Sequence, residues 1–410
     1  MRDQNGTSSI HKRPNGYVKH RYDDDDDVMC SLNGKQPRND SRIGHQLNSV
    51  YGTKYDQWLR SFQLRPCWEV HKDTVEVHIW HGYRPNPSSL SYCLKSAFYP
   101  SNETLNAWTH FIPFLLFCFR IYNVYCSLEY QTDDVTYPFW IFSIGCCFVF
   151  LVSTLAHLFN CYSATAQEFC YCLDYGGISV FGLSSAICIH YYMCSYRCFG
   201  FETDHLSLPA YPYVMSLLGI FATYVTCQSR FPFCRLRYLC RFGPTAICHT
   251  ICTVPCINRV IMTQHPSLLE GLNFASTDHE VCHLGDNYLH SFFFQTCSYV
   301  AAIGFVATRF PEKWFPGTFD IVGHSHQWFH IFTALGMYYQ HLMAEDSLRH
   351  ALALIEAGEL EENVLGINEW STVIPMFLFI TAVLFIVYST ASKVGSLVHK
   401  NRKENLSFEH

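Results

Sequence analysis

The sequence predicts an all-α protein that crosses a membrane about eight times, and three features of the chain support this prediction. Charged residues make up only 15% of the 410 residues, whereas a soluble globular domain carries about 25%. The charges are unevenly placed, because residues 1–100 are polar and the chain beyond residue 104 is largely apolar. The third feature is a series of apolar stretches of about 20 residues, the length that a helix needs to cross a bilayer.

The first hundred residues contain none of these stretches. Residues 1–60 lack apolar periodicity, so we expect them to form a disordered cytosolic tail. Residues 61–104 hold more aromatic side chains among their Arg and Lys residues, which is typical of a juxtamembrane segment at the bilayer interface. The net charge of −6 comes largely from the aspartate run at 23–27 and gives no sign of nucleic-acid binding.

Eight stretches have the length and apolar character of a membrane-spanning helix. They are residues 105–124, 137–159, 168–193, 207–227, 243–262, 288–308, 320–343 and 370–391. The fifth stretch is the least apolar, because His249, Asn258 and Arg259 interrupt it. The chain is therefore expected to be an integral, multi-pass membrane protein in contact with membrane lipids.

Basic residues predict how the spans are oriented. The loop at 228–242 carries four arginines and no acidic residue, and the tail at 392–410 is also basic. The loops at 125–136 and 346–369 are acidic. By the positive-inside rule, both termini face the cytosol, 346–369 is an exofacial loop, and 392–410 is a cytosolic tail. We expect this membrane to be the plasma membrane.

The 21 cysteines do not form the paired CxxC repeats of a zinc ribbon. Most of them lie in apolar stretches, where a thiol packs as a small hydrophobic group. Cys126, Cys194, Cys198 and Cys282 fall in predicted exofacial loops, where disulfides can persist. A bridge from residue 194 or 198 to residue 282 and four free thiols both remain open.

Polar residues inside spans are energetically costly, so they are candidates for function. Glu103, Asn106 and His110 open the first span and share one helix face. Ser153 and His157 close the second span, one turn apart. The predicted topology puts both of these helix ends on the cytosolic side of the membrane.

Three further polar residues reach the same depth. Asp174 lies early in the third span, and His326 and His330 lie early in the seventh, one turn apart. These ends are also cytosolic, so the groups occupy one layer roughly 5–15 Å inside the boundary, at a rise of 1.5 Å per residue. Four helices therefore bring ionisable groups to one depth of one leaflet.

Three histidines and an open position for water are the ligand set of a catalytic zinc site. His326 and His330 can both face one ion, and His157 can supply the third nitrogen. Asp174 is placed to orient or deprotonate the bound water, and Ser153 to hydrogen-bond the same water or a substrate oxygen. The alternative is that these are satisfied polar residues that join helices.

Other histidines suit the site less well. His324 is about 200° round the helix from His326, so it is expected to face away. His341 shares a face with His330 but lies about 16 Å deeper, too far for the same ion. His110 is expected to hydrogen-bond within its own polar face, and Arg120 to extend to the exofacial boundary.

These motifs together resemble the progestin and adipoQ receptor family, which is related to hemolysin-III-like proteins. The matching pieces are GYRP at 82–85, SNETLNAWTH at 101–110, SxxxH at 153–157 with Asp174 downstream, and SHQWFH at 325–330. The resemblance implies a seven-helix transmembrane core, residues 105–345, and a zinc ion on His157, His326 and His330. The additional span at 370–391 resembles the membrane progestin receptor branch of that family.

Three functions are compatible with these features. The first is a receptor for a steroid or related lipid that signals to cytosolic partners, whose identity the sequence does not indicate. The second is a zinc-dependent hydrolase of a lipid amide, as in ceramide hydrolysis, which the resemblance makes plausible. The third is a structural zinc ion that only clamps helices. Zn²⁺ is the cofactor expected in all three.

Overall fold

The computed structural model describes residues 53–128, 133–193, 207–231, 234, 236–264, 288–358 and 366–408. Most of the tail predicted at 1–60 lies outside these residues. The end of that tail differs from the prediction, because residues 53–60 belong to helix α2 (Thr53–Ser61). This segment is ordered by Leu59, which is buried at 3% exposure.

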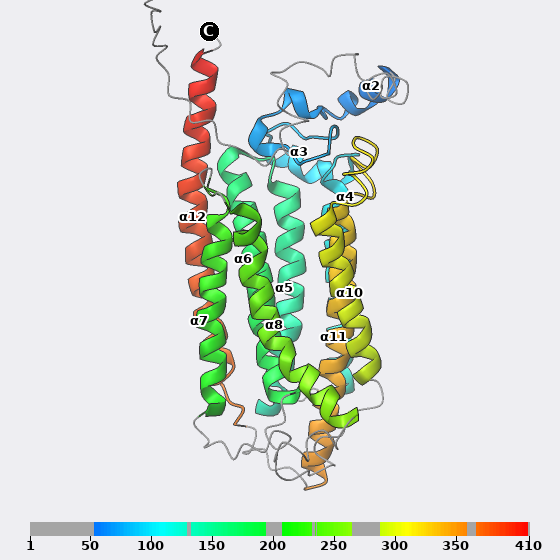
Figure 1. Ribbon diagram of the computed structural model, residues 1–410, viewed down its shortest axis with the longest axis vertical. Coiled ribbons are helices and arrows are strands. Elements are labelled where there is room, and N and C mark those ends of the chain that lie inside the picture. Colours follow the sequence, from blue (N-terminus) through cyan, green and yellow to red (C-terminus); the bar gives the residue numbers. More distant parts are fainter. Residues whose placement is uncertain are drawn as a thin grey trace, which may run out of the picture.

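Each of the eight predicted spans coincides with one long helix in the described part of the chain. These helices are α4 (Thr104–Ser127), α5 (Tyr137–Phe159), α6 (Ala164–Cys188), α7 (Ser207–Gln228), α8 (Arg237–Gln264), α10 (Tyr288–Thr308), α11 (Ser325–Glu356) and α12 (Val373–Phe408). They run side by side along the longest axis of the molecule (Figure 1). Among the described residues the β-structure is a single isolated bridge between Arg65 and Tyr83, so the all-α prediction is confirmed there.

Several helix ends differ from the predicted span ends. The seventh span begins at Ser325 rather than at 320, because Gly323 has a positive φ of 88° and His324 is extended. Helix α11 then continues to Glu356, so residues 346–356 of the predicted exofacial loop are helical. Helix α12 also continues through most of the predicted tail, where Val394 and Val398 are buried.

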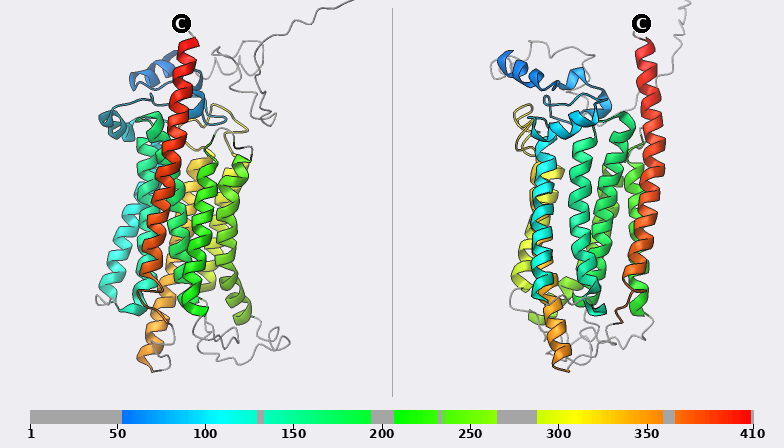
Figure 2. Two further views of the ribbon diagram at one scale, coloured as in Figure 1. Left: turned by 90° about the vertical axis from the view of Figure 1, so that its left-hand side faces the viewer. Right: turned by 180° about the vertical axis from the view of Figure 1, so that it is seen from behind.

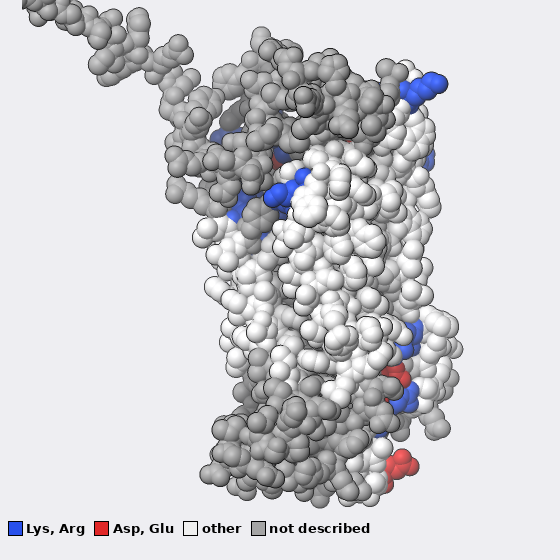
Figure 3. Space-filling view, turned by 45° about the vertical axis from the view of Figure 1, so that its right-hand side comes forward, with Lys and Arg blue, Asp and Glu red and all other residues white. Residues whose placement is uncertain are grey.

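Among the described residues, four helical segments are long and apolar enough to cross a membrane. They are Asp134–Phe159, Ala164–Tyr192, Tyr288–Thr308 and Val373–Arg402. On the face drawn in Figure 3, the described surface between the two ends of the molecule carries few charged side chains. These features support the prediction of an integral membrane protein, and the count of seven core helices plus one stays a prediction.

Helices α5 and α6 form the centre of the bundle. Helix α5 contacts α4, α6 and α11, and α6 contacts α7, α8 and α12. Phe139, Phe142 and Phe150 of α5 are completely buried in the main apolar core. Helix α12 lies along the edge of the bundle against α6 and α7 (Figure 2).

Residues 53–103 form a cap over one end of the bundle (Figure 1). The cap contains α2 and the short helix α3 (Leu90–Lys95). Asp320, which precedes α11, accepts hydrogen bonds from the backbone N–H groups of Trp80 at 3.0 Å and His81 at 2.9 Å. The C-terminal end of α12 lies at the same end of the molecule as the cap (Figure 2).

Candidate metal centre

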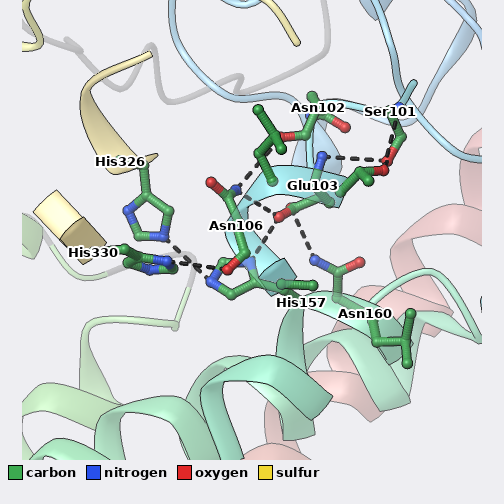
Figure 4. Close-up of polar contacts among 12 residues, drawn as sticks. Ser101, Asn102, Glu103, Asn106, His157, Asn160, His326 and His330 are labelled. Atoms are coloured by element: carbon green, nitrogen blue, oxygen red, sulfur yellow. Dashed lines mark hydrogen bonds and ion pairs between the residues drawn. The ribbon is translucent and has the colours of Figure 1, made fainter. Parts of the chain in front are cut away.

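Three histidines from two helices converge at the end of the bundle that the cap covers. His157 comes from the last turn of α5, and His326 and His330 come from the first two turns of α11. One nitrogen from each ring can be chosen so that all three lie within 4.8 Å of one another. The Nε2 atoms of His157 and His326 are 3.3 Å apart (Figure 4). The convergence predicted from the sequence is confirmed for these three residues.

Hydrogen bonds determine which nitrogen two of these rings can offer to a metal. His157 Nδ1 lies 2.7 Å from Glu103 Oε2, and His330 Nδ1 lies 3.2 Å from the backbone oxygen of Asn106. A carboxylate and a carbonyl can only accept, so both Nδ1 atoms donate and both Nε2 atoms keep their lone pairs. Neutral imidazoles held in this way are the ligands that zinc prefers, so the residues present fit the ion.

Glu103 belongs to the polar face that the sequence predicted, but its bond to His157 was not predicted. Its carboxylate accepts from His157, from Asn106 Nδ2 at 2.9 Å and from Asn160 Nδ2 at 2.9 Å (Figure 4). The sequence had placed Glu103 and Asn106 on one polar helix face, and the structure brings that face to the histidine cluster. The bond to His157 spans 54 positions of the chain, so no local pattern could indicate it.

His110 differs from the prediction. The sequence suggested a hydrogen bond within its polar face, yet neither ring nitrogen has a hydrogen-bond partner among the residues that the structure describes. Instead the ring stacks on His330, with 3.7 Å between ring centroids and 15° between planes. Asn106 and Glu103 bond each other and the metal-cluster histidines rather than His110.

Ser153 and Asp174 lie beside the cluster. Ser153 is buried one turn before His157 on α5. Asp174, half-buried on α6, lies near Ser153 and His157, and Ser153 Oγ has no hydrogen-bond partner among the described residues. Asp174 does not belong to the group of three ligand atoms within 4.8 Å of one another, and its role on a metal-bound water stays a prediction.

The histidines set apart by the sequence analysis are also apart in the structure. His324 Nε2 lies 3.2 Å from the backbone oxygen of Asn102, and the ring is not in the cluster. His341 bonds Ser143 at 3.0 Å and accepts from Arg120 Nε at 3.0 Å. The prediction that Arg120 extends to the boundary is wrong, because His341 and Glu345 offer it partners inside the bundle.

Arg84 of the GYRP motif joins the cap to the helix that carries His157. Its guanidinium donates to the backbone oxygens of His157 at 2.6 Å and Leu158 at 2.9 Å, and to the side chains of Asn160 and Ser96. The motif was visible in the sequence, but its contact with the end of α5 was not. Arg84 satisfies carbonyl groups that the end of a helix leaves without intrahelical partners.

The cysteine prediction is only partly covered by the structure. Cys126 forms no disulfide within the described residues. Cys194, Cys198 and Cys282 lie outside the described residues. A bridge from residue 194 or 198 to residue 282 therefore stays a prediction.

Comparison with known proteins places the candidate site in a shared region. A family model described as haemolysin-III related matches residues 98–341, which contain the three histidines, Glu103 and Asp174. Membrane progestin receptor gamma-A of Danio rerio is 34% identical over 281 residues, covering 66% of this chain and 79% of that protein. Membrane progestin receptor delta of Mus musculus is 30% identical over 336 residues, covering 80% and 90%. Membrane progestin receptor alpha of Homo sapiens is 24% identical, covering 72% and 81%.

Proposed function

We propose, because this chain belongs to the haemolysin-III-related family, that it is a membrane receptor for a steroid or a related lipid. The membership agrees with the resemblance to progestin and adipoQ receptors that the sequence motifs carry. The observation that supports the proposal most is the buried histidine cluster inside the matched region. The names of the relatives favour a steroid as the ligand.

The same proposal includes a zinc ion near the cytosolic face of the membrane. His157, His326 and His330 would hold it, with Glu103 orienting His157. The cap and the end of α12 lie at the same end of the bundle (Figure 1), which supports placing them on one side of the membrane, and the basic loop at 228–242 favours the cytosol as that side. A plasma-membrane location and cytosolic signalling partners complete the proposal.

A second function, hydrolysis of a lipid amide of the ceramidase type, is favoured by Ser153 and Asp174. Both lie beside the cluster without joining the ligand group. Zinc, when bound, supplies Lewis acidity to a carbonyl oxygen or to water. Asp174 would accept a proton from the attacking water, and the Ser153 hydroxyl would donate a hydrogen bond to the carbonyl oxygen of the amide. A purely structural zinc that clamps α5 to α11 is the third possibility.

Metal analysis of the purified protein tests the site. We expect about one zinc ion per chain, and substantial loss of zinc in His157→Ala, His326→Ala and His330→Ala, because three ligands leave little redundancy. His324→Ala is the matched control, since His324 is buried nearby but bonds Asn102 instead. Full zinc occupancy in the double variant His326→Ala, His330→Ala would refute the site.

Asp174→Asn separates the three functions. A hydrolase should keep its zinc and lose amide turnover by about 10²-fold or more, the usual scale for losing a general base. A pure receptor should keep ligand affinity in the variant and show no turnover in any form. If the zinc is purely structural, Asp174→Asn should only lower the unfolding temperature, because there is neither ligand binding nor turnover to lose. Steroid binding, lipid-amide turnover and thermal unfolding are measured on the same zinc-loaded preparation.

A further inference from the structure

A row of exposed apolar side chains follows the outside of helix α3 in the cap. Leu90 is 57% exposed and Leu94 is 51% exposed, and Phe98, in the short helical turn Ser96–Phe98 after α3, is 78% exposed. The three residues are four positions apart, a spacing that places neighbours on one side of a helical segment. Single exposed apolar side chains are common, whereas a group of them marks a contact surface. We call Leu90, Leu94 and Phe98 the α3 ridge.

The opposite side of α3 is packed against the bundle. Cys93 is completely buried, and its Sγ atom lies 3.5 Å from Sγ of Cys161, just beyond the end of α5. Ser96 Oγ accepts a hydrogen bond from Arg84 Nη1 at 2.8 Å, and the same guanidinium donates to the backbone oxygen of His157 at 2.6 Å. Helix α3 is therefore held in one orientation, with its buried side on the bundle and the α3 ridge turned away from it.

The α3 ridge continues into the exposed face of α4. The ring centroids of Phe98 and Trp108 are 5.9 Å apart, and Trp108 Nε1 donates to the backbone oxygen of Ala97 at 2.7 Å. Trp108 lies in the second turn of α4. After it, the exposed apolar side chains of this helix follow at helical spacing, at Ile112, Leu115, Leu116 and Phe119. In an integral membrane protein such a face contacts lipid, so the α3 ridge is continuous with a lipid-facing surface.

Helix α3 also lies at the level of the bilayer boundary. It is placed between α2 and the ends of the bundle helices (Figure 1). The lipid-facing side chains of α4 begin there, with Trp108, and tryptophan is enriched at the boundary between water and hydrocarbon. Lys95 is exposed on α3, and a lysine at this level can extend its ammonium group to lipid phosphates while its stem stays on apolar surface. An apolar ridge and a lysine at this level are the chemistry of an interfacial helix.

We propose that α3 is an interfacial membrane helix, and that the α3 ridge inserts into the phospholipid leaflet on the cap side of the membrane. The ridge reaches about 5–10 Å into the boundary between headgroups and acyl chains, the usual depth of such a helix. Lipid is the occupant, rather than a soluble protein or a second copy of the chain, because the ridge is continuous with the lipid-facing surface of α4. This contact requires neither the steroid nor the metal of the proposed function. It attaches the cap directly to the bilayer.

Photocrosslinking from lipid tests the contact on the full-length protein in phospholipid nanodiscs. The probe is a phosphatidylcholine with a diazirine near the ester end of one acyl chain, and mass spectrometry of proteolytic peptides locates the adducts. We expect adducts on residues 90–98 and on the exposed face of α4, and none above background on α2. Helix α2 is the internal control, because Trp58 is 48% exposed in the same cap but α2 lies farther from the bundle (Figure 1).

The double variant Leu90→Glu, Leu94→Glu changes the α3 ridge and leaves the buried side of α3 as it is. Carboxylates are excluded from the apolar layer, so adducts on residues 90–98 should fall by about fivefold or more. Adducts on α4 should remain, and together with an unchanged unfolding temperature they show that the variant is folded and embedded. Trp58→Glu is the matched control, because it puts a carboxylate at an exposed apolar position of α2 and should leave the adducts on residues 90–98 unchanged.

Three results would overturn the interfacial helix. In the first, residues 90–98 of the wild type carry no adducts although α4 does, and two copies per nanodisc would then identify a second copy of the chain as the occupant of the ridge. In the second, α2 and α3 are labelled equally, which would mean that the cap touches lipid without a preferred side. In the third, the double variant keeps the full labelling of residues 90–98.

Discussion

Glu103 is the residue on which the geometry of the histidine cluster depends most directly. Its carboxylate fixes the His157 ring and is itself held by two side-chain amides, those of Asn106 and Asn160. A carboxylate in this position orients a metal-binding imidazole and raises its basicity. Glu103 therefore acts on the metal through His157 rather than by contact.

We predict that Glu103→Gln lowers zinc affinity by about 10- to 100-fold, the usual effect of removing such a partner. The amide keeps the shape of the side chain but loses the charge that favours the His157 N–H donor. Competition with a fluorescent zinc chelator measures the affinity. Glu69→Gln is the control, because Glu69 pairs with Arg60 on the surface of the cap. Equal affinity in the wild type and Glu103→Gln would contradict the assigned role.

The sequence predicted the three ligands and a supporting polar face with Glu103 and Asn106, but not the contacts that this face makes with the ligands. His326 and His330 are one helical turn apart, and the predicted topology brings His157 to the same depth. Helix spacing and topology were therefore sufficient to predict that the three histidines meet. The groups that hold His157 come from residues far away in the chain: Glu103 bonds its ring across 54 positions, and Arg84 bonds its backbone oxygen across 73. Such contacts depend on how helices pack, which no pattern in one segment records.

At the scale of helices, two glycines of α6 differ in what surrounds them. A Cβ atom added at Gly177 would lie 2.5 Å from Val152 Cγ2 on α5. A Cβ atom added at Gly182 would meet nothing within 4 Å. Close approach of helices through small residues is a common way to pack helices in membranes. Gly177 therefore sets the spacing between the two central helices.

We predict opposite effects of alanine at these two positions. Gly177→Ala should destabilise the protein by about 1–3 kcal/mol, the cost of forcing an extra carbon into a packed interface. Gly182→Ala should be neutral or stabilising by up to about 1 kcal/mol, because alanine favours the helix. Unfolding of both variants in the same detergent is the measurement. A stable Gly177→Ala protein would show that α5 and α6 can separate at little cost.

The existence of the helices could be predicted from sequence more reliably than their ends. The length of each apolar stretch indicated every one of the eight long helices that the structure describes. The additional turns of α11 after residue 343 are polar, so a hydropathy criterion stops before them. The start at Ser325 depends on the backbone conformation of Gly323 and His324, which is a local geometric feature without a hydropathy signal.

At the scale of the whole molecule, the cap is tied to the far end of the chain. Arg402 of α12 donates to the Asp73 carboxylate at 2.5 Å and contacts Asn86 at 3.3 Å. Burial raises the pKa of the Asp73 carboxyl, but hydrogen bonds from His71 and Arg402 outweigh burial, and the pKa lies below its usual 3.8. A carboxyl whose pKa is lower in the folded state stabilises that state when it is ionised.

This linkage predicts that the stability of the folded protein depends on pH. The contribution of Asp73 should be fully present above about pH 4 and should be lost as the pH falls below that value, because acid protonates the carboxylate. Asp73→Asn should unfold at a lower temperature than the wild type at pH 7, and the difference should shrink toward pH 3. Asp133→Asn, at an exposed position, is the control. If the unfolding temperatures of wild type and Asp73→Asn differ by the same amount at every pH, the linkage is contradicted.

The shared location of the cap and the end of α12 bears on topology. If both termini are cytosolic, epitope tags placed before residue 1 and after residue 410 should be protected from protease added to intact cells. Permeabilised cells provide the control, since both tags should then be cleaved. Cleavage of only the C-terminal tag in intact cells would mean an odd number of spans.

The contacts of Arg84 with α5 respond to acid differently from the ion pair between Arg402 and Asp73. Arg84 binds two backbone carbonyls, an amide oxygen and a hydroxyl, and none of these acceptors gains a proton in the range where proteins stay folded. The guanidinium likewise stays charged there. Acidification therefore weakens the ion pair that joins α12 to the cap at Asp73. The hydrogen bonds of Arg84 that join the cap to α5 are unaffected. In an acidified protein, the end of α12 near Arg402 would loosen from the cap, while the cap would stay attached to α5 through Arg84.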